Sequence, residues 1–327
     1  MNQVYDSLVI GGGPAGLSAA LAIHQSSGTV LIVEREARLG GILKQCIHDG
    51  FGLIRLKKQL TGPEYAEYYI SQLALTPIEV HVKTYVSSIE KDGPYFKAIL
   101  VNREEGLHTV YAKTVILATG CRERTSKQIY TGGTRPSGVY TAGTAQYLVN
   151  IDGLLPCKRC VILGSGDIGL IMARRLALEG STVLGVYEVK SEPSGLKRNI
   201  QQCLVDFDIP LYLSHTVVAV EGDERVEAVI IAKVDDDGNP IEASKTRVAC
   251  DGLILSVGLI PENEIAEMLG VALDSRTGGP VVNTAQETSV PGVFVCGNAL
   301  KVYDLVDHVS ESGEIAGNSA VRYIRGE

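Results

Sequence analysis

Three glycines, Gly11, Gly13 and Gly16, follow the apolar run SLVI and precede a segment whose apolar residues recur at helical spacing. In a G-x-G-x-x-G pattern the first glycine permits a tight turn, the second lets the backbone approach a pyrophosphate, and the third lets helix and strand pack closely. The pyrophosphate would lie at the helix N-terminus, where N–H groups and the helix dipole favour negative charge. The pattern predicts a phosphate-binding strand–turn–helix.

An acidic residue at the expected distance makes this prediction more specific. Glu34 ends the second apolar strand, 23 residues after Gly11, where its carboxylate can accept hydrogen bonds from the hydroxyls of an adenosine ribose. A glycine fingerprint alone also occurs as an ordinary turn in α/β proteins, and the acid makes that alternative a minor one. The first site is predicted to comprise Gly11, Gly13, Pro14, Ala15, Gly16 and Glu34.

The same strand, turn, helix and acid-terminated strand occur a second time, in the segment that begins CVILGSGDIG. Glu188 lies 24 residues after the first glycine of this copy. An acid there favours NAD(H), because a carboxylate would repel the 2′-phosphate of NADP(H). The alternative for Glu188 is a solvated strand end. The second site is predicted to comprise Gly164, Gly166, Asp167, Ile168, Gly169 and Glu188.

Each fingerprint is followed by alternating, hairpin-like strands, in residues 79–106 and 215–243, and then by an apolar strand that ends on a glycine. This order indicates an internal duplication. A last strand signal at 292–298 and a final helix from about residue 306 to 324 have no fingerprint of their own. Because doubly wound domains need complete sheets, we expect this C-terminal segment to return to the first domain.

The fold class predicted is therefore α/β, with two Rossmann-like dinucleotide-binding domains, each with a β-meander, and with the second domain inserted into the first. The expected boundaries are 1–123 with 256–327 for the first domain and 124–255 for the second. The first and second domains each contain one fingerprint, one terminal acid and one meander.

Composition excludes several classes of function. The formal charge of −8 and the absence of a basic run argue against a nucleic-acid partner. The longest apolar stretch, GLILSVGLI, is about half the length that spans a bilayer, and the first residues lack the basic region of a secretory signal. Seven cysteines, an odd number, do not suggest a disulfide framework. We expect a soluble, cytoplasmic protein without a membrane span and without a metal.

The order of several motifs resembles that of the two-domain FAD/NAD(P) pyridine nucleotide oxidoreductases, a group that includes low-molecular-weight thioredoxin reductases. The motifs are GGGPAG, the glycine pair at 40 and 41, ILATG at 116–120, SVGLIPEN at 256–263 and TSVPGVFVCGN at 288–298, so the resemblance covers essentially the whole chain. It implies that the first domain binds FAD and the second binds a nicotinamide cofactor, NAD(H).

The resemblance also adds residues to both sites. It implies that Asn298, where the family usually has aspartate, contacts the ribityl-phosphate region of FAD, and that the helix start near 307–309 directs its N–H groups at the pyrimidine edge of the flavin. Asparagine can still form a hydrogen bond there, but its amide changes the donor pattern. The residues added are Gly41, Gly120, Gly297, Asn298 and Val309 for FAD, and Gly258 for NAD.

Cysteine positions distinguish the chain from the disulfide reductases that it resembles. Relatives of glutathione reductase have C-x4-C after the glycine pair, whereas this segment holds a single cysteine, Cys46. The one C-x-x-C, Cys157 and Cys160, directly precedes the second fingerprint, so Cys160 is expected to enter a strand, a poor position for a redox thiolate. We interpret this C-x-x-C as a chance occurrence, not a redox pair. A zinc site is also not expected, because the sequence offers no second pair of ligands beside these two cysteines.

The remaining candidates for catalysis are Cys46 and His48, in a loop that the resemblance places near the flavin, for proton transfer or acceptor contact. The alternatives are a packing cysteine and a surface histidine. His308, at the start of the last helix, is a second candidate on the same reasoning.

Four segments resemble a narrower group: QCIHDGFG, RPSGVYTAGTAQ, RNIQQCLVDFDIPL and CGNALKVYDLVDHVSES. They are similar to FAD/NAD companion proteins of bacterial glycerol-3-phosphate dehydrogenases and, more distantly, to subunits of opine, sarcosine and cyanide-forming amine dehydrogenases. The resemblance implies an oxidoreductase that transfers hydride or electrons between NAD(H) and FAD and on to a partner flavoenzyme or small acceptor, as a homo- or hetero-oligomer. The alternatives are a thioredoxin-reductase-like disulfide reductase, a ferredoxin reductase, and a non-catalytic FAD/NAD-binding subunit.

Overall fold

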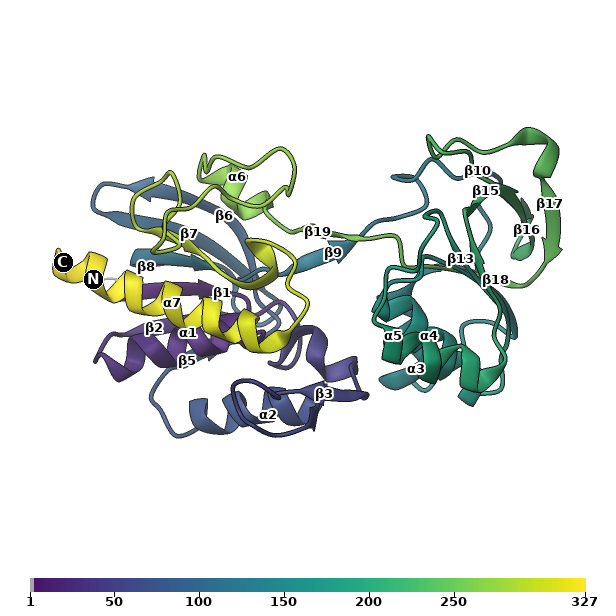
Figure 1. Ribbon diagram of the computed structural model, residues 1–327. Helices are drawn as coiled ribbons and strands as arrows, with labels where there is room; N and C mark the ends of the chain where they lie inside the picture. The colour runs from purple at the N-terminus through teal and green to yellow at the C-terminus, as the bar shows by residue number, and fades with distance from the viewer. Residues whose placement is uncertain (1–2) are drawn as a thin grey trace. The chain divides into compact units, whose positions relative to one another are not determined.

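The computed structural model describes residues 3–327 and divides into two compact units. The first unit consists of the chain up to Arg122 together with Ile260–Glu327, and the second is Glu123–Leu259. Both combine parallel strands and helices with antiparallel strands, which belong to the main sheet in the first unit and form a smaller sheet in the second (Figure 1). The predicted α/β fold class is confirmed.

The first unit contains a seven-stranded sheet in the order β5-β2-β1-β8-β7-β6, and β20 pairs with β8. Strands β5, β2, β1, β8 and β20 are parallel, and β6 to β8 form the antiparallel meander. Its elements are β1 (Val4–Ile10), α1 (Pro14–Gln25), β2 (Val30–Val33), η1 (Gly41–Gln45), β3 (Asp49–Phe51), β4 (Leu60–Thr61), α2 (Gly62–Leu73), β5 (Glu79–His81), β6 (Tyr85–Asp92), β7 (Tyr95–Asn102), β8 (Gly106–Leu117), α6 (Glu264–Met268), β20 (Val293–Val295), η4 (Gly297–Ala299) and α7 (Val306–Arg325).

The meander of the first unit differs in two ways from the sequence prediction. Glu79–His81 is a parallel strand beside β2 and does not belong to the meander, because Lys83, with φ of 51°, ends the extended run before β6 begins. The closing strand that leads to Gly120 is continuous with the third strand of the meander, as the 12-residue β8. No glycine or proline follows Gly106 until Gly120, so no turn interrupts it.

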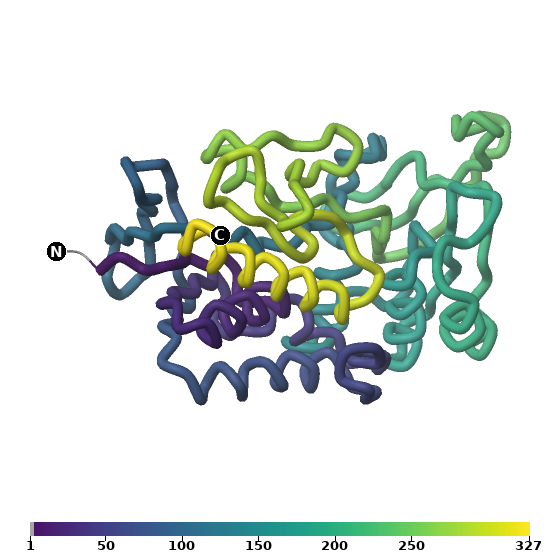
Figure 2. Tube along the Cα trace, turned by 60° about the vertical axis from the view of Figure 1, so that its left-hand side comes forward, coloured from purple at the N-terminus to yellow at the C-terminus, as the bar shows by residue number. Residues whose placement is uncertain are grey.

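Helix α7 packs along α1 at close range, and the two lie side by side in Figures 1 and 2. Two glycines of α7 make this approach possible. A Cβ at Gly313 would lie 2.1 Å from the carbonyl oxygen of Ala15, and one at Gly317 would lie 2.5 Å from that of Ala19. The C-terminal helix is therefore fitted against the helix that follows the first fingerprint.

The second unit has a parallel five-stranded sheet in the order β11-β18-β12-β13-β14 and a smaller sheet in the order β10-β15-β16-β17. A turn at residues 235–239 joins β16 to the segment before β17, and the Asp235 carboxylate there accepts the backbone N–H groups of Asp237 and Asn239. The elements are β10 (Gly132–Gly133), β11 (Val139–Thr141), α3 (Ala142–Asn150), β12 (Arg159–Leu163), α4 (Asp167–Leu178), β13 (Thr182–Glu188), α5 (Lys197–Cys203), η2 (Val205–Phe207), β14 (Leu211–Leu213), β15 (His215–Gly222), β16 (Val226–Lys233), η3 (Glu242–Ser244), β17 (Thr246–Ala249) and β18 (Gly252–Leu255).

Two short strands, β9 (Cys121–Glu123) and β19 (Leu259–Pro261), connect the units and pair with each other. Among the helices of the described chain, none is both long enough and apolar enough to cross a membrane.

Candidate functional site

The first fingerprint forms the turn between β1 and α1, and two of its glycines are fixed by the backbone around them. Gly11 has φ of 111°, and a Cβ there would lie 2.3 Å from the carbonyl oxygen of Ala118. A Cβ on Gly16 would lie 1.9 Å from the carbonyl oxygen of Gly11. These two positions require glycine for the turn itself and for helix packing.

Gly13 differs from its two neighbours in the fingerprint. Its backbone is extended, with φ of −79° and ψ of −177°, and the nearest atom to an added Cβ would be the Cα of Gly41, at 3.8 Å. The protein itself therefore leaves room for a side chain at Gly13, and its packing does not explain why this residue is glycine. This is the property that close approach of a pyrophosphate requires.

The helices that follow the two fingerprints begin without a side-chain cap. Helix α1 begins after Gly13 and α4 after Gly166, and neither has a side-chain hydrogen bond at its cap. In contrast, Thr61 caps α2 and Thr141 caps α3 through their hydroxyl oxygens. The first amides of α1 and α4 therefore fit an external anion such as a pyrophosphate.

Glu34 directly follows β2, and its carboxylate is held against the fingerprint turn. The side chain is 5% exposed. Oε2 accepts the backbone N–H of Gly12 at 2.7 Å, and Oε1 accepts that of Glu36 at 2.8 Å. A carboxylate oxygen has a second lone pair, so the group fixed in this way can still accept a ribose hydroxyl.

The structure brings other predicted FAD residues to the same turn. Gly40 donates its N–H to the carbonyl oxygen of Gly12 at 2.8 Å, which places the glycine pair beside the fingerprint. A Cβ added at Gly297 would lie 2.8 Å from the Cβ of Ala15 and 3.3 Å from a methyl carbon of Val309, so Gly297 lies against both residues. Pro14 is the first residue of α1.

Asn298 and Gly120 lie at the end of the sheet. Asn298 accepts the backbone N–H of Tyr303 at 3.1 Å through Oδ1, and its Nδ2 donates to Cys121 at 3.5 Å. The carbonyl oxygen of Gly120 accepts the N–H of Glu262 at 2.9 Å, and an added Cβ would meet nothing within 4 Å.

The candidate catalytic residues Cys46 and His48 both follow η1. Burial raises the pKa of the Cys46 thiol to about 12, and its Sγ donates to the carbonyl oxygen of Ile42 at 3.3 Å. At neutral pH the group is a protonated thiol and not a nucleophilic thiolate. His48 lies with its ring centroid 5.1 Å from that of Phe51. His308 is exposed, and its Nδ1 lies 3.3 Å from a carboxylate oxygen of Glu311.

The second fingerprint repeats the geometry of the first. Gly164 has φ of 101°, and a Cβ there would lie 2.0 Å from the carbonyl oxygen of Ser256. A Cβ on Gly169 would lie 2.5 Å from the carbonyl oxygen of Gly164. Gly166 is open, because its nearest neighbour would be the Ser256 hydroxyl at 4.0 Å.

Glu188, the last residue of β13, is held at this second turn by two serines. Its Oε2 accepts the Ser165 N–H at 3.0 Å and hydroxyl at 2.5 Å, and also the Ser194 hydroxyl at 3.2 Å. Burial by itself would raise the pKa of Glu188, but these hydrogen bonds and one from the Lys190 N–H hold its pKa below the ordinary value. Glu188 is a buried carboxylate and not the solvated strand end considered above.

The other residues predicted to bind NAD are Asp167, Ile168 and Gly258, and each contacts a different part of the protein. The Asp167 carboxylate turns to the loop before α5, where it accepts the Leu196 N–H at 2.8 Å and the Asn199 amide at 2.7 Å. Ile168 is partly buried against the core. Gly258 lies on the connecting segment, and its carbonyl oxygen accepts the N–H of Arg124 at 3.0 Å.

The polar residues that fix the second acid and the last helix were missed by the sequence analysis. Ser165 is fully buried, and Ser312 accepts the N–H of Gly297 at 3.1 Å. Ser165 lies inside the second fingerprint, so its position one residue after Gly164 could have signalled a contact to the terminal acid. Nothing in the sequence distinguishes Ser312 from the other polar residues of its helix.

Cys157 and Cys160 lie in the core of the second unit, with 3% and 0% exposure. Cys160 is within β12, as predicted. Both are thiols that hydrogen-bond to each other, and this contact together with burial raises the pKa of Cys160.

A glutamine at position 188 tests the role of the second acid. Glu188→Gln should weaken NADH binding and reduce the preference for NADH over NADPH by about tenfold, because loss of one charge-assisted hydrogen bond costs about 1.5 kcal/mol or more. NADH and NADPH titrations of the flavin-loaded protein measure the ratio. Glu34→Gln is the matched control and should leave that ratio unchanged. An unaltered ratio in Glu188→Gln would remove Glu188 from the nicotinamide site.

The lowered pKa of Glu188 also predicts a pH dependence of stability. A depressed folded-state pKa stabilises the fold at pH values above the ordinary value of 4.5, and this contribution is lost as pH falls through the lowered pKa. Glu188→Gln should therefore lose less stability than the wild type when denaturant unfolding is compared at neutral pH and below pH 4.5. Equal acid sensitivity in both proteins would contradict this account.

Together, two uncapped glycine turns, each beside a buried acid, define a two-site dinucleotide-binding protein. The chain belongs to the pyridine nucleotide-disulphide oxidoreductase family, whose model matches residues 5–313. Members of this family are oxidoreductases that bind FAD and a nicotinamide dinucleotide.

The chain is similar to several proteins of bacteria. Hydrogen cyanide synthase subunit HcnB of Pseudomonas protegens is 26% identical over 89% of the chain, and an opine oxidase subunit of Agrobacterium tumefaciens is 23% identical over 98%. The chain spans 65% of the length of each of these two proteins. A ferredoxin–NADP reductase 2 of Bacillus thuringiensis is 23% identical over 90% of the chain and 85% of that protein.

Solved structures show the same fold. Thioredoxin reductase of Lactococcus lactis aligns with a TM-score of 0.79 at 22% identity, over 99% of this chain and 100% of that one. L-proline dehydrogenase from P. horikoshii aligns with a TM-score of 0.70 at 23% identity, over 96% of this chain and 54% of that one. The fold is that of the thioredoxin-reductase-like FAD/NAD(P)-binding proteins.

Proposed function

We propose that the protein carries electrons between NADH, bound in the second unit, and a partner dehydrogenase that oxidises a small metabolite, by way of FAD bound in the first unit. The observation that carries this proposal is the position of the C-x-x-C pair. Both of its thiols lie in a core, 3% and 0% exposed, where a partner disulfide has no access. The flavin, and not a protein disulfide, is then where electrons leave this chain.

FAD, when bound, supplies a carrier that accepts electrons as hydride and passes them on. The chain's own residues bind and orient the two cofactors. In the first unit the α1 N-terminus would receive the pyrophosphate, Glu34 the adenosine ribose and Asn298 the ribityl region. The start of α7 would stabilise negative charge on the reduced ring. In the second unit, α4 and Glu188 would have the corresponding roles for NADH. Cys46 and His48 remain the candidates for proton transfer.

The partner proposed is a dehydrogenase of the glycerol-3-phosphate, opine or amine type. Two relatives are named as subunits, one of hydrogen cyanide synthase and one of opine oxidase, which supports a role within a hetero-oligomeric complex. The proposal includes a cytoplasmic location, because Cys157, Cys160, Cys203, Cys250 and Cys296 are all buried thiols.

The direct test is anaerobic addition of NADH to the yellow, flavin-loaded protein. Loss of the flavin absorbance within a turnover time is expected, and full retention of the colour would contradict the proposal in favour of a non-catalytic subunit. Capture of the native complex, followed by the same titration, then tests the partner. A co-purifying metabolite dehydrogenase whose substrate changes the flavin's redox state would support the second half of the proposal.

A disulfide reductase is the second candidate, because hydrogen bonding from Cys160 lowers the pKa of Cys157. The double variant Cys157→Ser, Cys160→Ser separates the two functions. We expect it to keep NADH-dependent flavin reduction and electron transfer to the partner, since both thiols are enclosed in the core. Thiol titration of the NADH-reduced wild type should show no additional thiols, and two extra thiols would favour the disulfide reductase. Cys203→Ser, at another buried cysteine of the same unit, is the matched control.

A further inference from the structure

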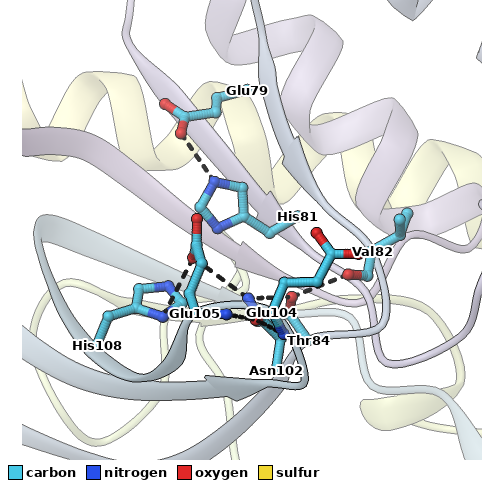
Figure 3. A network of polar contacts seen from close by, with 8 residues as sticks. All are labelled: Glu79, His81, Val82, Thr84, Asn102, Glu104, Glu105 and His108. Carbon is cyan, nitrogen blue, oxygen red and sulfur yellow. Dashed lines mark hydrogen bonds and ion pairs between the residues drawn. The ribbon is translucent and has the colours of Figure 1, made fainter.

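Two histidines and a glutamate meet in the first unit, away from the fingerprint turn. His81 is the last residue of β5, Glu105 lies in the turn between β7 and β8, and His108 is in β8. Their ligand atoms all lie within 4.8 Å of one another, and the two imidazole ring centroids are 5.8 Å apart. Figure 3 shows that the carboxylate of Glu105 lies between the two imidazoles.

The imidazole nitrogens at this cluster are shielded from solvent without a hydrogen-bond partner among the described residues. These are Nδ1 of His81 and both ring nitrogens of His108. The contact between His108 Nδ1 and Glu105 Oε2, at 3.4 Å, is an ion pair only when the imidazole is protonated. A bound ion would satisfy ring nitrogens of both histidines, because buried polar atoms are nearly always bonded to a protein group, water or an ion.

The surroundings of His81 orient it as a metal ligand. Its Nε2 bonds to Glu79 Oε1 at 2.8 Å, and the other oxygen of Glu79 accepts the Tyr5 hydroxyl at 2.6 Å. A carboxylate that accepts one ring N–H fixes the tautomer and leaves the other nitrogen, here Nδ1, as the donor to a metal. Asn102 similarly donates to Glu105 Oε2, at 3.3 Å.

We propose that His81, Glu105 and His108 bind one divalent transition-metal ion of the Zn²⁺ class. Two imidazoles and one carboxylate are a ligand set that suits Zn²⁺, and water would occupy the fourth position. Tetrahedral Zn²⁺ with bonds of about 2.1 Å places its ligand atoms about 3.4 Å apart, so the cluster needs only small side-chain rotations to close. Mg²⁺ and Ca²⁺, which prefer oxygen ligands, are disfavoured.

The ion would stabilise the segment that holds Glu34, the residue proposed to bind the adenosine ribose of FAD. The carbonyl oxygen of His81 accepts the backbone N–H of Glu34 at 2.8 Å, and the Glu34 carbonyl oxygen accepts the N–H of Thr84 at 3.0 Å. A metal bound by His81, Glu105 and His108 would tie the β7–β8 turn to this segment. The role is structural, because the ribose-binding carboxylate is positioned through the backbone next to a ligand.

The test is metal binding by the flavin-loaded protein after removal of any affinity tag and treatment with a chelator. Isothermal titration with Zn²⁺ is expected to give one equivalent per chain, and Co²⁺ should give visible d–d absorption to the red of the flavin band. Wild type is compared with His81→Ala, His108→Ala and Glu105→Gln. His24→Ala, which removes a histidine of α1 outside the cluster, is the matched control. A cooperative thermal unfolding transition in the absence of Zn²⁺ verifies that each variant is folded.

We expect His81→Ala and His108→Ala to lose this equivalent, Glu105→Gln to bind at least tenfold more weakly, and His24→Ala to bind as the wild type does. Zn²⁺ should also raise the midpoint of thermal unfolding of the wild type but not of His108→Ala. The proposal is overturned if no equivalent binds, or if His81→Ala and His108→Ala bind Zn²⁺ as tightly as the wild type. Neither readout uses NADH or a partner protein, so this result is independent of the proposed electron transfer.

Discussion

Gly13→Ala is expected to weaken FAD binding by about ten- to a hundredfold while leaving the flavin-free fold intact. The added methyl group has room in the protein, since its nearest neighbour would be the Cα of Gly41 at 3.8 Å, and alanine readily adopts φ of −79°. It would, however, stand where the backbone must approach the pyrophosphate. Loss of one charge-assisted hydrogen bond costs about 1.5–3 kcal/mol, which corresponds to this range of affinity.

The measurement is FAD titration of flavin-free protein, together with thermal unfolding before FAD is added. Alanine is a poorer helix cap than glycine, so a decrease in stability of about 1 kcal/mol or less is expected. Gly11→Ala is the contrasting variant. Its Cβ would lie 2.3 Å from a backbone carbonyl oxygen at a φ of 111°, so the unfolding midpoint itself should fall. If Gly13→Ala retained FAD as the wild type does, the pyrophosphate would have to lie elsewhere.

The difference between these two glycines also shows what the sequence could predict. The fingerprint specifies local backbone geometry over six residues, so the turn, the helix start and the acid at the end of the next strand all followed from spacing alone. The contact that requires glycine at position 16, with the carbonyl oxygen of Gly11, is local in the chain, whereas the contact at Gly11 is with the carbonyl oxygen of Ala118. The return of the C-terminal segment to the first domain was expected from the need to complete a sheet, and the structure pairs its strand β20 with β8.

Features that depend on tertiary contacts were not predictable in this way. His81 is separated from Glu105 and His108 by two strands, and no spacing rule joins them. The assignment of Glu79–His81 to the meander was wrong, because EVHVKTYV alternates as a hairpin strand does. The strand is interrupted at Lys83, whose backbone is left-handed. Lysine is not a residue type that indicates a left-handed backbone, so the sequence did not predict this break. The contact of Ser194 with Glu188 was not predictable either, because it depends on the loop that brings Ser194 back to the turn, where its N–H also bonds to the Ser165 hydroxyl.

Gly166→Ala is the reciprocal experiment and should affect only the nicotinamide cofactor. An added Cβ would have the Ser256 hydroxyl as its nearest neighbour, at 4.0 Å, and φ of −65° suits alanine, so the second unit should remain folded. We expect FAD content equal to that of the wild type and NADH binding weakened by about ten- to a hundredfold, for the same reason as at Gly13. The two substitutions therefore assign one cofactor to each fingerprint.

Stopped-flow reduction over a range of NADH concentrations measures this effect. If Gly166 acts only in binding, the rate at saturating NADH should approach that of the wild type, while the concentration that gives half this rate should rise. Reduction by dithionite, which needs no nucleotide site, should be unchanged and serves as the control. An unaltered NADH dependence would show that the second fingerprint does not bind the nicotinamide cofactor. Loss of FAD from Gly166→Ala would instead mean that the two cofactors had been assigned to the wrong units.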